Sequence, residues 1–385
     1  MSIKNMEYKN IIFYAEAFPP NQGGGENYSV ELASTLTRLG YNVELITPVE
    51  SGNEDHYPFR VKRIRRPIKL SGFNLNIFYI IKLLLKNKSS IIHIGGPTAI
   101  DSLLVIFCKI ANVPLVVTFH GQFNSRLGRL IQKIAGELLY PLADRIIVQS
   151  NRDMKLLSRM NQKTKIKLMY FNGIDTNKYK CKEVLEWSKD SDANEHFKLI
   201  FIGGISSSRP YKGVENLIMI FKKLTDTYKY DSVKLTIVGD GDLRLALESR
   251  TNSYPNIVFK GKLADDELIK ELCKSDALIL PSISEGEGFG RVVLESISCG
   301  KPVLVSKYAG VAELIEKYKA GLIFDPNDIE DSIQKIIFLL NNRSCLINYG
   351  KNAEDMIKSE GLDLLSSTSK TIEIYEDISK HRSKI

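Results

Sequence analysis

Short runs rich in isoleucine, valine and phenylalanine recur along this chain, and each is followed by a longer stretch of helical periodicity. βαβ units require this order. The runs are continuously apolar, as expected of parallel strands covered on both faces. In the first half we predict strands at Asn10–Ala15, Asn42–Thr47, Ile91–Ile94, Pro114–Phe119, Arg145–Gln149 and Ile166–Met169. In the second half we predict them at Lys198–Gly203, Val233–Val238, Asn256–Phe259, Ala277–Leu280 and Pro302–Val305.

The alternation dissolves once, between Asn172 and Phe197, where the chain is polar and charged. A chain of 385 residues is too long for one ordinary core. We therefore predict an α/β protein with two doubly wound domains at residues 1–180 and 196–360, and a helical tail at residues 361–385. In such sheets, ligands bind near the carboxyl ends of the strands.

Composition narrows the class of protein. With 43% hydrophobic and 25% charged residues, the chain is not disordered. The first apolar run, residues 11–15, has the length of a strand, and later apolar stretches are too short to span a membrane. The five cysteines are far apart and include no C-x-x-C pair. This spacing argues against a disulfide framework and a structural zinc, so we expect a cytoplasmic protein in a reducing compartment.

The first half of the chain carries the net charge of +8. Residues 1–175 hold 23 lysines and arginines against 13 acids, a net of +10, which leaves 30 against 32, a net of −2, in the rest. Phe59 to Lys88 contains nine basic residues, no acid and many apolar residues. Such a stretch suits a solvated face, an anionic membrane surface or nucleic acid. No zinc-finger or RNP-type motif supports nucleic acid.

Two glycine-rich loops lie where predicted strands end. One contains Gly24 and Gly25, and the other runs from Gly203 through Arg209 and Lys212 into a helix. Glycines allow backbone N–H groups to approach an anion at the positive end of a helix. A guanidinium grips two oxygens and an ammonium offers a point charge. The second loop therefore favours a diphosphate ligand, whereas a flexible turn explains the first almost as well.

The most specific stretch reads Ser-Glu-Gly-Glu-Gly-Phe-Gly-Arg at residues 284–291, between a predicted strand and a helix. Gly288 and Gly290 permit close backbone approach. Glu287 lies in the loop, and Glu295 follows less than two turns into the helix. Both carboxylates could accept hydrogen bonds from the paired hydroxyl groups of one elongated ligand, such as a sugar or ribose. A glycine-rich turn with surface acids is the alternative.

Two weaker signals remain. His120 follows the predicted strand Pro114–Phe119, where a ligand or a bond to local backbone would explain it equally well. Asp240 and Asp242 form an acid-x-acid motif, which would suit a metal-dependent transferase with a single domain. Their late position in the second domain argues against that interpretation.

An ordered set of motifs resembles the retaining glycosyltransferases of family 4. The motifs are Gly-Gly-Gly-Glu-Asn at 23–27, Asn-Gly-Ile-Asp at 172–175, Tyr-Lys-Gly at 211–213, Val-Gly-Asp-Gly at 238–241 and Glu-Gly-Phe-Gly at 287–290, with a second glutamate at 295. The resemblance runs from about Asn10 to Leu322. It implies the GT-B fold, in which two Rossmann-like domains face each other across a cleft.

The resemblance also implies roles for single residues. Glu287 matches the acid that contacts the donor sugar, Glu295 the acid that binds the ribose, and Lys212 the lysine that holds the diphosphate. His120 matches the histidine beside the reacting sugar. The donor-binding loops would contribute Gly24, Gly25, Gly203, Gly288, Phe289 and Gly290.

The chain departs from the family pattern at one position. Family members usually have arginine directly after the glycine that matches Gly203, and this chain has Gly204 in a loop longer by a few residues. We expect Arg209 to supply the missing guanidinium. Because Arg209, Lys212 and helix N-termini would stabilise the leaving diphosphate, we expect neither a metal nor another cofactor.

The expected activity is the transfer of a hexose-type sugar from a UDP- or GDP-sugar to a lipid-linked or polysaccharide acceptor, as in O-antigen, capsule or lipopolysaccharide biosynthesis. The basic first half predicts peripheral association with an anionic membrane surface at the inner face of the plasma membrane, and no nucleic acid partner. A nucleotide-sugar epimerase of the same fold and a non-catalytic nucleotide-sugar-binding subunit remain alternatives. An epimerase would need no acceptor.

Overall fold

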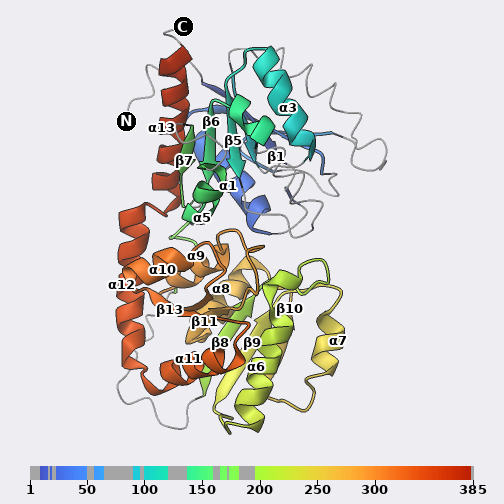
Figure 1. Cartoon of the computed structure of the whole chain (residues 1–385), viewed down its shortest axis with the longest axis vertical. Coiled ribbons are helices and arrows are strands. Elements are labelled where there is room, and N and C mark those ends of the chain that lie inside the picture. The colour runs from blue at the N-terminus through green and yellow to red at the C-terminus, as the bar shows by residue number, and fades with distance from the viewer. Residues whose placement is uncertain are drawn as a thin grey trace. The chain divides into compact units, whose positions relative to one another are not determined.

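The computed structural model describes residues 9–15, 18–19, 23–49, 56–64, 90–95, 99–119, 137–158, 165–170, 173–181 and 196–382. The chain divides into two compact units, which are described separately (Figure 1). Unit 1 comprises Met1–Gly173 together with Leu364–Ile385, and unit 2 comprises Ile174–Asp363. The chain therefore leaves unit 1 once and returns to it for its last helix.

Unit 1 contains a sheet of seven described strands, all parallel, in the order β3-β2-β1-β4-β5-β6-β7. The strands are β1 (Asn10–Ala15), β2 (Asn42–Thr47), β3 (Arg60–Arg63), β4 (Ser90–Gly95), β5 (Leu115–Phe119), β6 (Arg145–Val148) and β7 (Ile166–Leu168). The sequence pattern predicted six of them within about one residue and missed β3.

Helices cover both faces of this sheet because alternate side chains of each strand point to opposite faces. Ile12 and Tyr14 pack with α3 (Ala99–Ile110) and α5 (Asn151–Ser158). Their neighbours Ile11 and Phe13 pack with α1 (Gly24–Arg38) and with the C-terminal helix α13 (Leu364–Arg382). The short helix η2 (Tyr140–Leu142) precedes β6. The tail that we expected as a separate helical element thus belongs to the core of unit 1.

Unit 2 contains a sheet of six described parallel strands in the order β10-β9-β8-β11-β12-β13. They are β8 (Phe197–Ile202), β9 (Val233–Val238), β10 (Ile257–Gly261), β11 (Ala277–Leu280), β12 (Val303–Ser306) and β13 (Gly321–Phe324). The sequence predicted all of these except β13. Both sheets have the order of a doubly wound fold, and the strand order of unit 2 reverses between β8 and β11.

The core of unit 2 lies between the sheet and its helices. One face packs against α6 (Val214–Asp226) and α11 (Ile329–Asn341), and α12 (Ser344–Glu360) adds Leu346 at its edge. The short helix η3 (Pro210–Lys212) leads into α6. The remaining helices are α7 (Arg244–Ser249), α8 (Asp265–Lys274), α9 (Arg291–Ser298) and α10 (Ala312–Tyr318).

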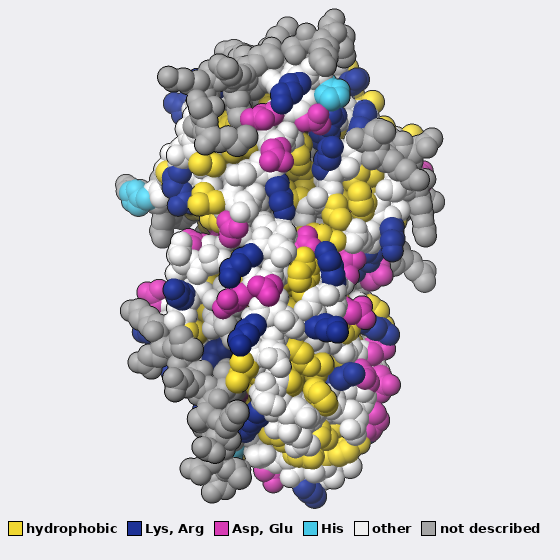
Figure 2. Space-filling view, turned by 90° about the vertical axis from the view of Figure 1, so that its left-hand side faces the viewer, with side chains coloured by type: hydrophobic (Ala, Val, Ile, Leu, Met, Phe, Trp, Pro, Cys, Tyr) yellow, Lys and Arg dark blue, Asp and Glu magenta, His cyan; other side chains and the backbone are white. Residues whose placement is uncertain are grey.

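The basic stretch that we singled out is described only in part. Its first residues form β3, where the Arg63 guanidinium donates to the carbonyl oxygens of Pro19 (3.0 Å) and Val49 (2.7 Å). Arg63 is therefore a structural residue, whereas residues 65–88 lie outside the described part. On the face drawn in Figure 2, the basic and acidic side chains of described residues are interspersed. No helix in the described ranges is long and apolar enough to cross a membrane.

The expectation of no disulfide is wrong. Cys181 and Cys273 are bonded, with Cα atoms 5.6 Å apart although 92 residues separate them in sequence. The reason is the path of residues 173–181, which brings Lys178 to Asp265 and Cys181 to Cys273, both on α8. Spacing along the chain cannot reveal such an approach.

Candidate functional site

Two loops of unit 2 meet at the point where the strand order reverses. One follows β8 and runs from Gly203 to Gly213, and the other follows β11 and runs from Pro281 to Gly290. Because β8 and β11 are neighbours, the loops leave adjacent strand ends. The candidate residues of the second predicted domain lie on these loops and on the first turns of α9.

An ion pair between Lys212 and Glu287 joins the two loops. The Lys212 Nζ donates to Glu287 Oε2 at 2.6 Å, and the Ser282 hydroxyl donates to the same oxygen at 3.1 Å. The Lys212 side chain is 16% exposed and that of Glu287 10%. Burial is the largest single influence and pushes the pKa of Lys212 downward, but the Glu287 carboxylate and Tyr211 together outweigh it and raise the pKa above its usual value. Lys212 therefore keeps its positive charge at a mostly buried position.

The loops approach each other through Gly213, the N-cap of α6. Its φ of +70° lies in the left-handed region, and a Cβ at this position would lie 2.0 Å from the Pro281 carbonyl oxygen. Only glycine permits both the conformation and the contact. The Ile283 N–H also donates to the Tyr211 carbonyl at 2.9 Å. These two contacts fix the distance between the loops that carry Lys212 and Glu287.

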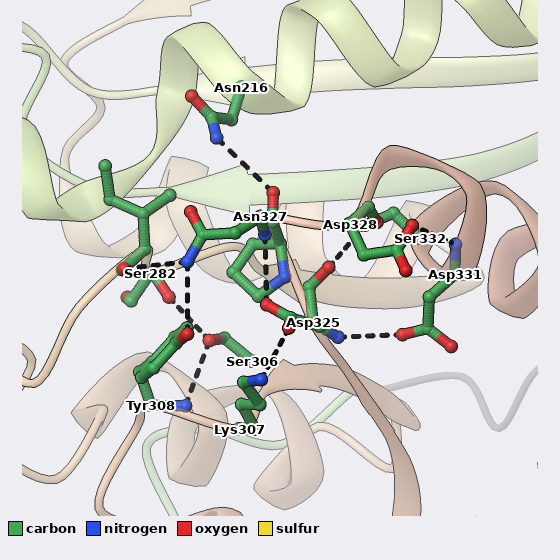
Figure 3. A network of polar contacts seen from close by, with 12 residues as sticks. Asn216, Ser282, Ser306, Lys307, Tyr308, Asp325, Asn327, Asp328, Asp331 and Ser332 are labelled. Carbon is green, nitrogen blue, oxygen red and sulfur yellow. Dashed lines mark hydrogen bonds and ion pairs between the residues drawn. The ribbon is translucent and has the colours of Figure 1, made fainter.

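A polar network holds the second loop from the other side (Figure 3). The Ser306 hydroxyl, at the end of β12, donates to the Ser282 carbonyl, and Asn327 donates to the Ile283 carbonyl at 3.3 Å. Asn216 of α6 donates to the Pro326 carbonyl at 3.3 Å. Asp328 caps the N-terminus of α11 by accepting from the N–H groups of residues 330 and 331. The network therefore positions Ser282, which in turn contacts Glu287.

Arg209 fills the space left by the glycine after Gly203. A Cβ built on Gly204 would lie 3.6 Å from an Arg209 guanidinium nitrogen and 3.7 Å from its Cδ. Arg209 is exposed, and its charge acts to lower the pKa of Lys212. Two cations thus stand at one strand end, where an anion would relieve their repulsion.

Glu295 lies in α9 and is 4% exposed. Its Oε1 accepts from Arg291 Nε at 2.8 Å, one helical turn earlier, and from the Tyr179 hydroxyl at 3.2 Å. Burial and then the Glu295 charge raise the pKa of Tyr179 well above its usual range, so the phenol stays protonated and donates. The helix begins at Arg291, after the N-cap Gly290 with its φ of +96°.

Two backbone carbonyls of the Glu-Gly-Phe-Gly segment accept hydrogen bonds from backbone N–H groups. The Gly310 N–H donates to the Gly288 carbonyl at 3.0 Å, and the Val311 N–H donates to the Phe289 carbonyl at 2.9 Å. The Phe289 side chain is buried. The segment is therefore held against the turn that precedes α10, which fixes the loop between Glu287 and α9.

In unit 1 the structure describes the glycine loop but not the histidine. Gly24 and Gly25, which we expected in a loop, form the first turn of α1. His120 lies outside the described residues, directly after β5. Asp240 and Asp242 belong to unit 2. Asp240 pairs with Arg244 (3.0 Å), and hydrogen bonds, first from Ser207 and then from Ser206, lower the pKa of Asp242 to about 2.

Sequence reasoning missed three residues of this arrangement. Ser282 lies two residues before the stretch 284–291 and Arg291 ends it, but neither residue type in isolation indicates a partner. Tyr179 lies 116 residues from Glu295 in sequence, so no local spacing connects them. The signal available was weak, namely a tyrosine four residues after the Asn-Gly-Ile-Asp motif.

Two protein-family models match this chain. The model described as Glycosyltransferase Family 4 matches residues 22–178, and the model described as Glycosyl transferases group 1 matches residues 184–358. The sulfoquinovosyl transferase SQD2 of Arabidopsis thaliana is 27% identical, over 94% of this chain and 72% of the relative. The N-acetyl-alpha-D-glucosaminyl L-malate synthase of Bacillus anthracis is 24% identical, over 88% and 90%.

Solved structures share the fold. HepE of Anabaena in complex with UDP superposes with a TM-score of 0.76 at 19% identity, covering 96% of this chain and 100% of HepE. WaaG, a glycosyltransferase involved in lipopolysaccharide biosynthesis, gives a TM-score of 0.71 at 16% identity, covering 94% and 99%. Together with the two parallel sheets, this likeness identifies the GT-B fold.

Proposed function

This chain belongs to the family 4, group 1 glycosyltransferases, which transfer sugar from a nucleotide-sugar donor, and we propose that it moves a hexose-type sugar to a lipid-linked or polysaccharide acceptor with retention of anomeric configuration. The observation that carries the proposal is the Lys212–Glu287 pair between two loops at the strand-order reversal. In this pair, a cation that suits a phosphate group, Lys212, lies beside a carboxylate that suits sugar hydroxyls, Glu287.

The proposed donor site divides by charge. Lys212 and Arg209 bind the diphosphate and stabilise the negative charge that develops on it as the sugar departs. Glu287 leaves Lys212 when the donor enters and accepts hydrogen bonds from sugar hydroxyls. Tyr179 and Arg291 both donate to Glu295 Oε1, and we assign Oε2 to the ribose. HepE of Anabaena has been solved in complex with UDP and with UDP-glucose, which supports a uridine donor as the first to test.

The remaining roles rest on the resemblance. We assign His120 to the reacting sugar, and Gly24 and Gly25 to the donor phosphates at the N-terminus of α1. Same-face attack, in which the departing phosphate takes the proton of the acceptor, is the proposed route to retention. The acceptor and the pathway are proposals drawn from the basic first half of the chain, which suits an anionic membrane surface.

A donor panel with the purified protein tests this function. UDP-glucose, UDP-galactose, UDP-N-acetylglucosamine and GDP-mannose are incubated with a membrane lipid extract, and the anomeric proton of the product is read by NMR. We expect release of nucleoside diphosphate only when acceptor is present, and an α-linked product from an α-linked donor. Epimerised donor without acceptor would identify an epimerase instead, and no turnover of any donor would contradict the proposal.

Glu287→Gln tests the residue that carries the argument. Loss of the carboxylate should lower turnover by at least about a hundredfold, because one preorganised interaction with the transition state is lost. It should also lower the free energy of unfolding by about 1–3 kcal/mol, because Lys212 loses its partner at a mostly buried position. Glu285→Gln, which changes an exposed acid two residues earlier, is the matched control and should leave turnover unchanged.

A further inference from the structure

Three cysteines from separate elements of unit 2 converge beside the proposed ribose carboxylate. Cys181 ends the segment 174–181, Cys273 lies in α8, and Cys299 follows the last residue of α9. Their sulfur atoms all lie within 4.8 Å of one another. Cys181 and Cys273 are bonded, and the sulfur of Cys181 lies 3.2 Å from the Cys299 carbonyl oxygen.

The bonded pair is accessible and the third cysteine is not. Cys181 and Cys273 are both half-buried, so a small thiol can reach them, whereas Cys299 is 5% exposed. Burial, and then the nearby Glu295 charge, raise the pKa of Cys299 to about 12. Because the thiolate is the species that attacks a disulfide, Cys299 does not compete for either partner at neutral pH. The exchangeable pair is therefore Cys181 with Cys273.

The Cys181–Cys273 disulfide attaches to α8 the segment whose Tyr179 contacts Glu295. Tyr179, two residues before Cys181, donates to Glu295 Oε1 at 3.2 Å. Its neighbour Lys178 pairs with Asp265 of α8, but both side chains are well exposed (39% and 64%), and such pairs contribute little. The disulfide is thus the stronger of the two attachments between this segment and α8.

We infer that Cys181 and Cys273 form a reversible disulfide that sets how firmly Tyr179 orients Glu295, and through Glu295 how tightly the donor nucleotide binds. Accessible disulfides are the more labile ones and often have regulatory roles, whereas buried structural disulfides resist reduction. Oxidation transfers two electrons and two protons from the two thiols to a small disulfide such as oxidised glutathione, which leaves as two thiols. A dithiol reductant reverses the step and restores both cysteine thiols.

The geometry indicates that oxidation tightens nucleotide binding. In the oxidised chain, Tyr179 and Arg291 together hold Oε1 and leave Oε2 oriented for a ribose hydroxyl. In the reduced chain the segment is held less firmly and Tyr179 donates for a smaller fraction of the time. We expect the oxidised protein to bind nucleoside diphosphate about three- to tenfold more tightly, the range of one net hydrogen bond. This effect rests on the proposed function, because it assigns the ribose to Glu295.

The experiment uses the full chain, reduced with a phosphine or oxidised with oxidised glutathione. Thiol titration should find five thiols in the reduced protein and three in the oxidised one, and peptide mapping should find the Cys181–Cys273 link. Amide hydrogen exchange of residues 174–181 should slow on oxidation. Calorimetry with UDP and with GDP should give the lower Kd in the oxidised state.

Matched variants separate the steps. Cys181→Ser should behave as reduced protein under both conditions, whereas Cys345→Ser, a half-buried cysteine outside the cluster, should keep the full redox response. Tyr179→Phe should still form the bond but lose the difference in Kd.

Peptide mapping would overturn the inference if it found a disulfide to Cys299 or no disulfide at all. So would an amide exchange rate of residues 174–181, or a Kd for nucleoside diphosphate, that is the same in the oxidised and reduced protein. Stoichiometric zinc binding by the three thiols of the reduced protein would also overturn it, because the cluster would then be a metal site. Failure of UDP and GDP to bind either form would instead contradict the proposed function, and mapping and exchange would still decide whether the reversible bond exists.

Discussion

At the scale of single residues, we propose that Arg209 supplies the guanidinium that the chain lacks at position 204. Its guanidinium lies against the position where a Gly204 side chain would begin. We predict that Arg209→Ala weakens UDP binding about tenfold, the effect of losing one charge-assisted hydrogen bond. Adding Gly204→Arg in that background should restore much of the affinity, measured by calorimetry. Arg250→Ala, which removes the same charge from a well-exposed position outside both loops, is the control.

The double variant, Arg209→Ala with Gly204→Arg, distinguishes two ways in which Arg209 could act. A weakened Arg209→Ala that Gly204→Arg cannot rescue would mean that Arg209 acts through the loop conformation rather than by placing a charge. An Arg209→Ala variant with unchanged UDP affinity would exclude it from the phosphate site altogether.

Lys301 makes the stability of unit 2 depend on pH. It is 3% exposed, and burial lowers its pKa from 10.5 to about 8. Between pH 8 and 10.5 the unfolded chain binds more protons at this lysine than the folded one, so its contribution to stability rises with pH. Relative to Lys301→Met, the wild-type free energy of unfolding should therefore increase by up to about 3 kcal/mol across this window. Urea unfolding from pH 7 to 10 measures the difference, and a constant difference would contradict the assignment.

At the scale of elements, the contact between α6 and the loop after β11 depends on Gly213. Gly213→Ala should cost about 1–2 kcal/mol for the left-handed backbone and a further amount for the clash with the Pro281 carbonyl. Gly300→Ala separates the two costs, because Gly300 has a similar φ of +72° but no atom within 4 Å of a Cβ. We predict that only Gly213→Ala also weakens UDP binding. Equal destabilisation in urea unfolding would show that the contact is relaxed without cost.

The two strands that the sequence did not predict, β3 and β13, are edge strands, as are β7 and β10, which it did predict. Among the described strands β3 and β13 each pair with one neighbour, and their side chains are mostly half-buried. An edge strand needs no continuous apolar run. The sequence Arg-Val-Lys-Arg of β3 has none, so the search for apolar runs missed this strand within the basic stretch. Central strands such as β1 and β11 are buried at every residue except Asn10 and were therefore predictable from their apolar runs.

The same distinction holds for the candidate site. Glu287 and Lys212 were identifiable because local loop motifs carry them, and the pairing of β8 with β11 brings those loops together. Tyr179 and the disulfide depend on the path of the chain through space, which no local pattern encodes. Site residues on the loops of adjacent strands were therefore predictable from the sequence, whereas site residues from a distant segment were not.

At the scale of the whole molecule, unit 1 is built from both ends of the chain. Ile374, Tyr375 and Ile378 of α13 are buried in the core that α1 shares. Arg145 also binds Asp377 through two nitrogens, at 2.7 and 2.6 Å. Burial of three such side chains contributes about 5 kcal/mol, which is comparable to the stability of an entire domain.

A chain that ends at residue 363 should therefore lose the folding of unit 1 while unit 2 remains intact. Calorimetry should show two unfolding transitions in the full chain and one in the truncated chain, with the surviving transition unchanged because unit 2 keeps all of residues 174–363. Leu365→Ala, which alters a side chain in the same helix that is 60% exposed, should leave both transitions in place. Two transitions in the truncated chain would mean that α13 adds stability to unit 1 without being required for its fold.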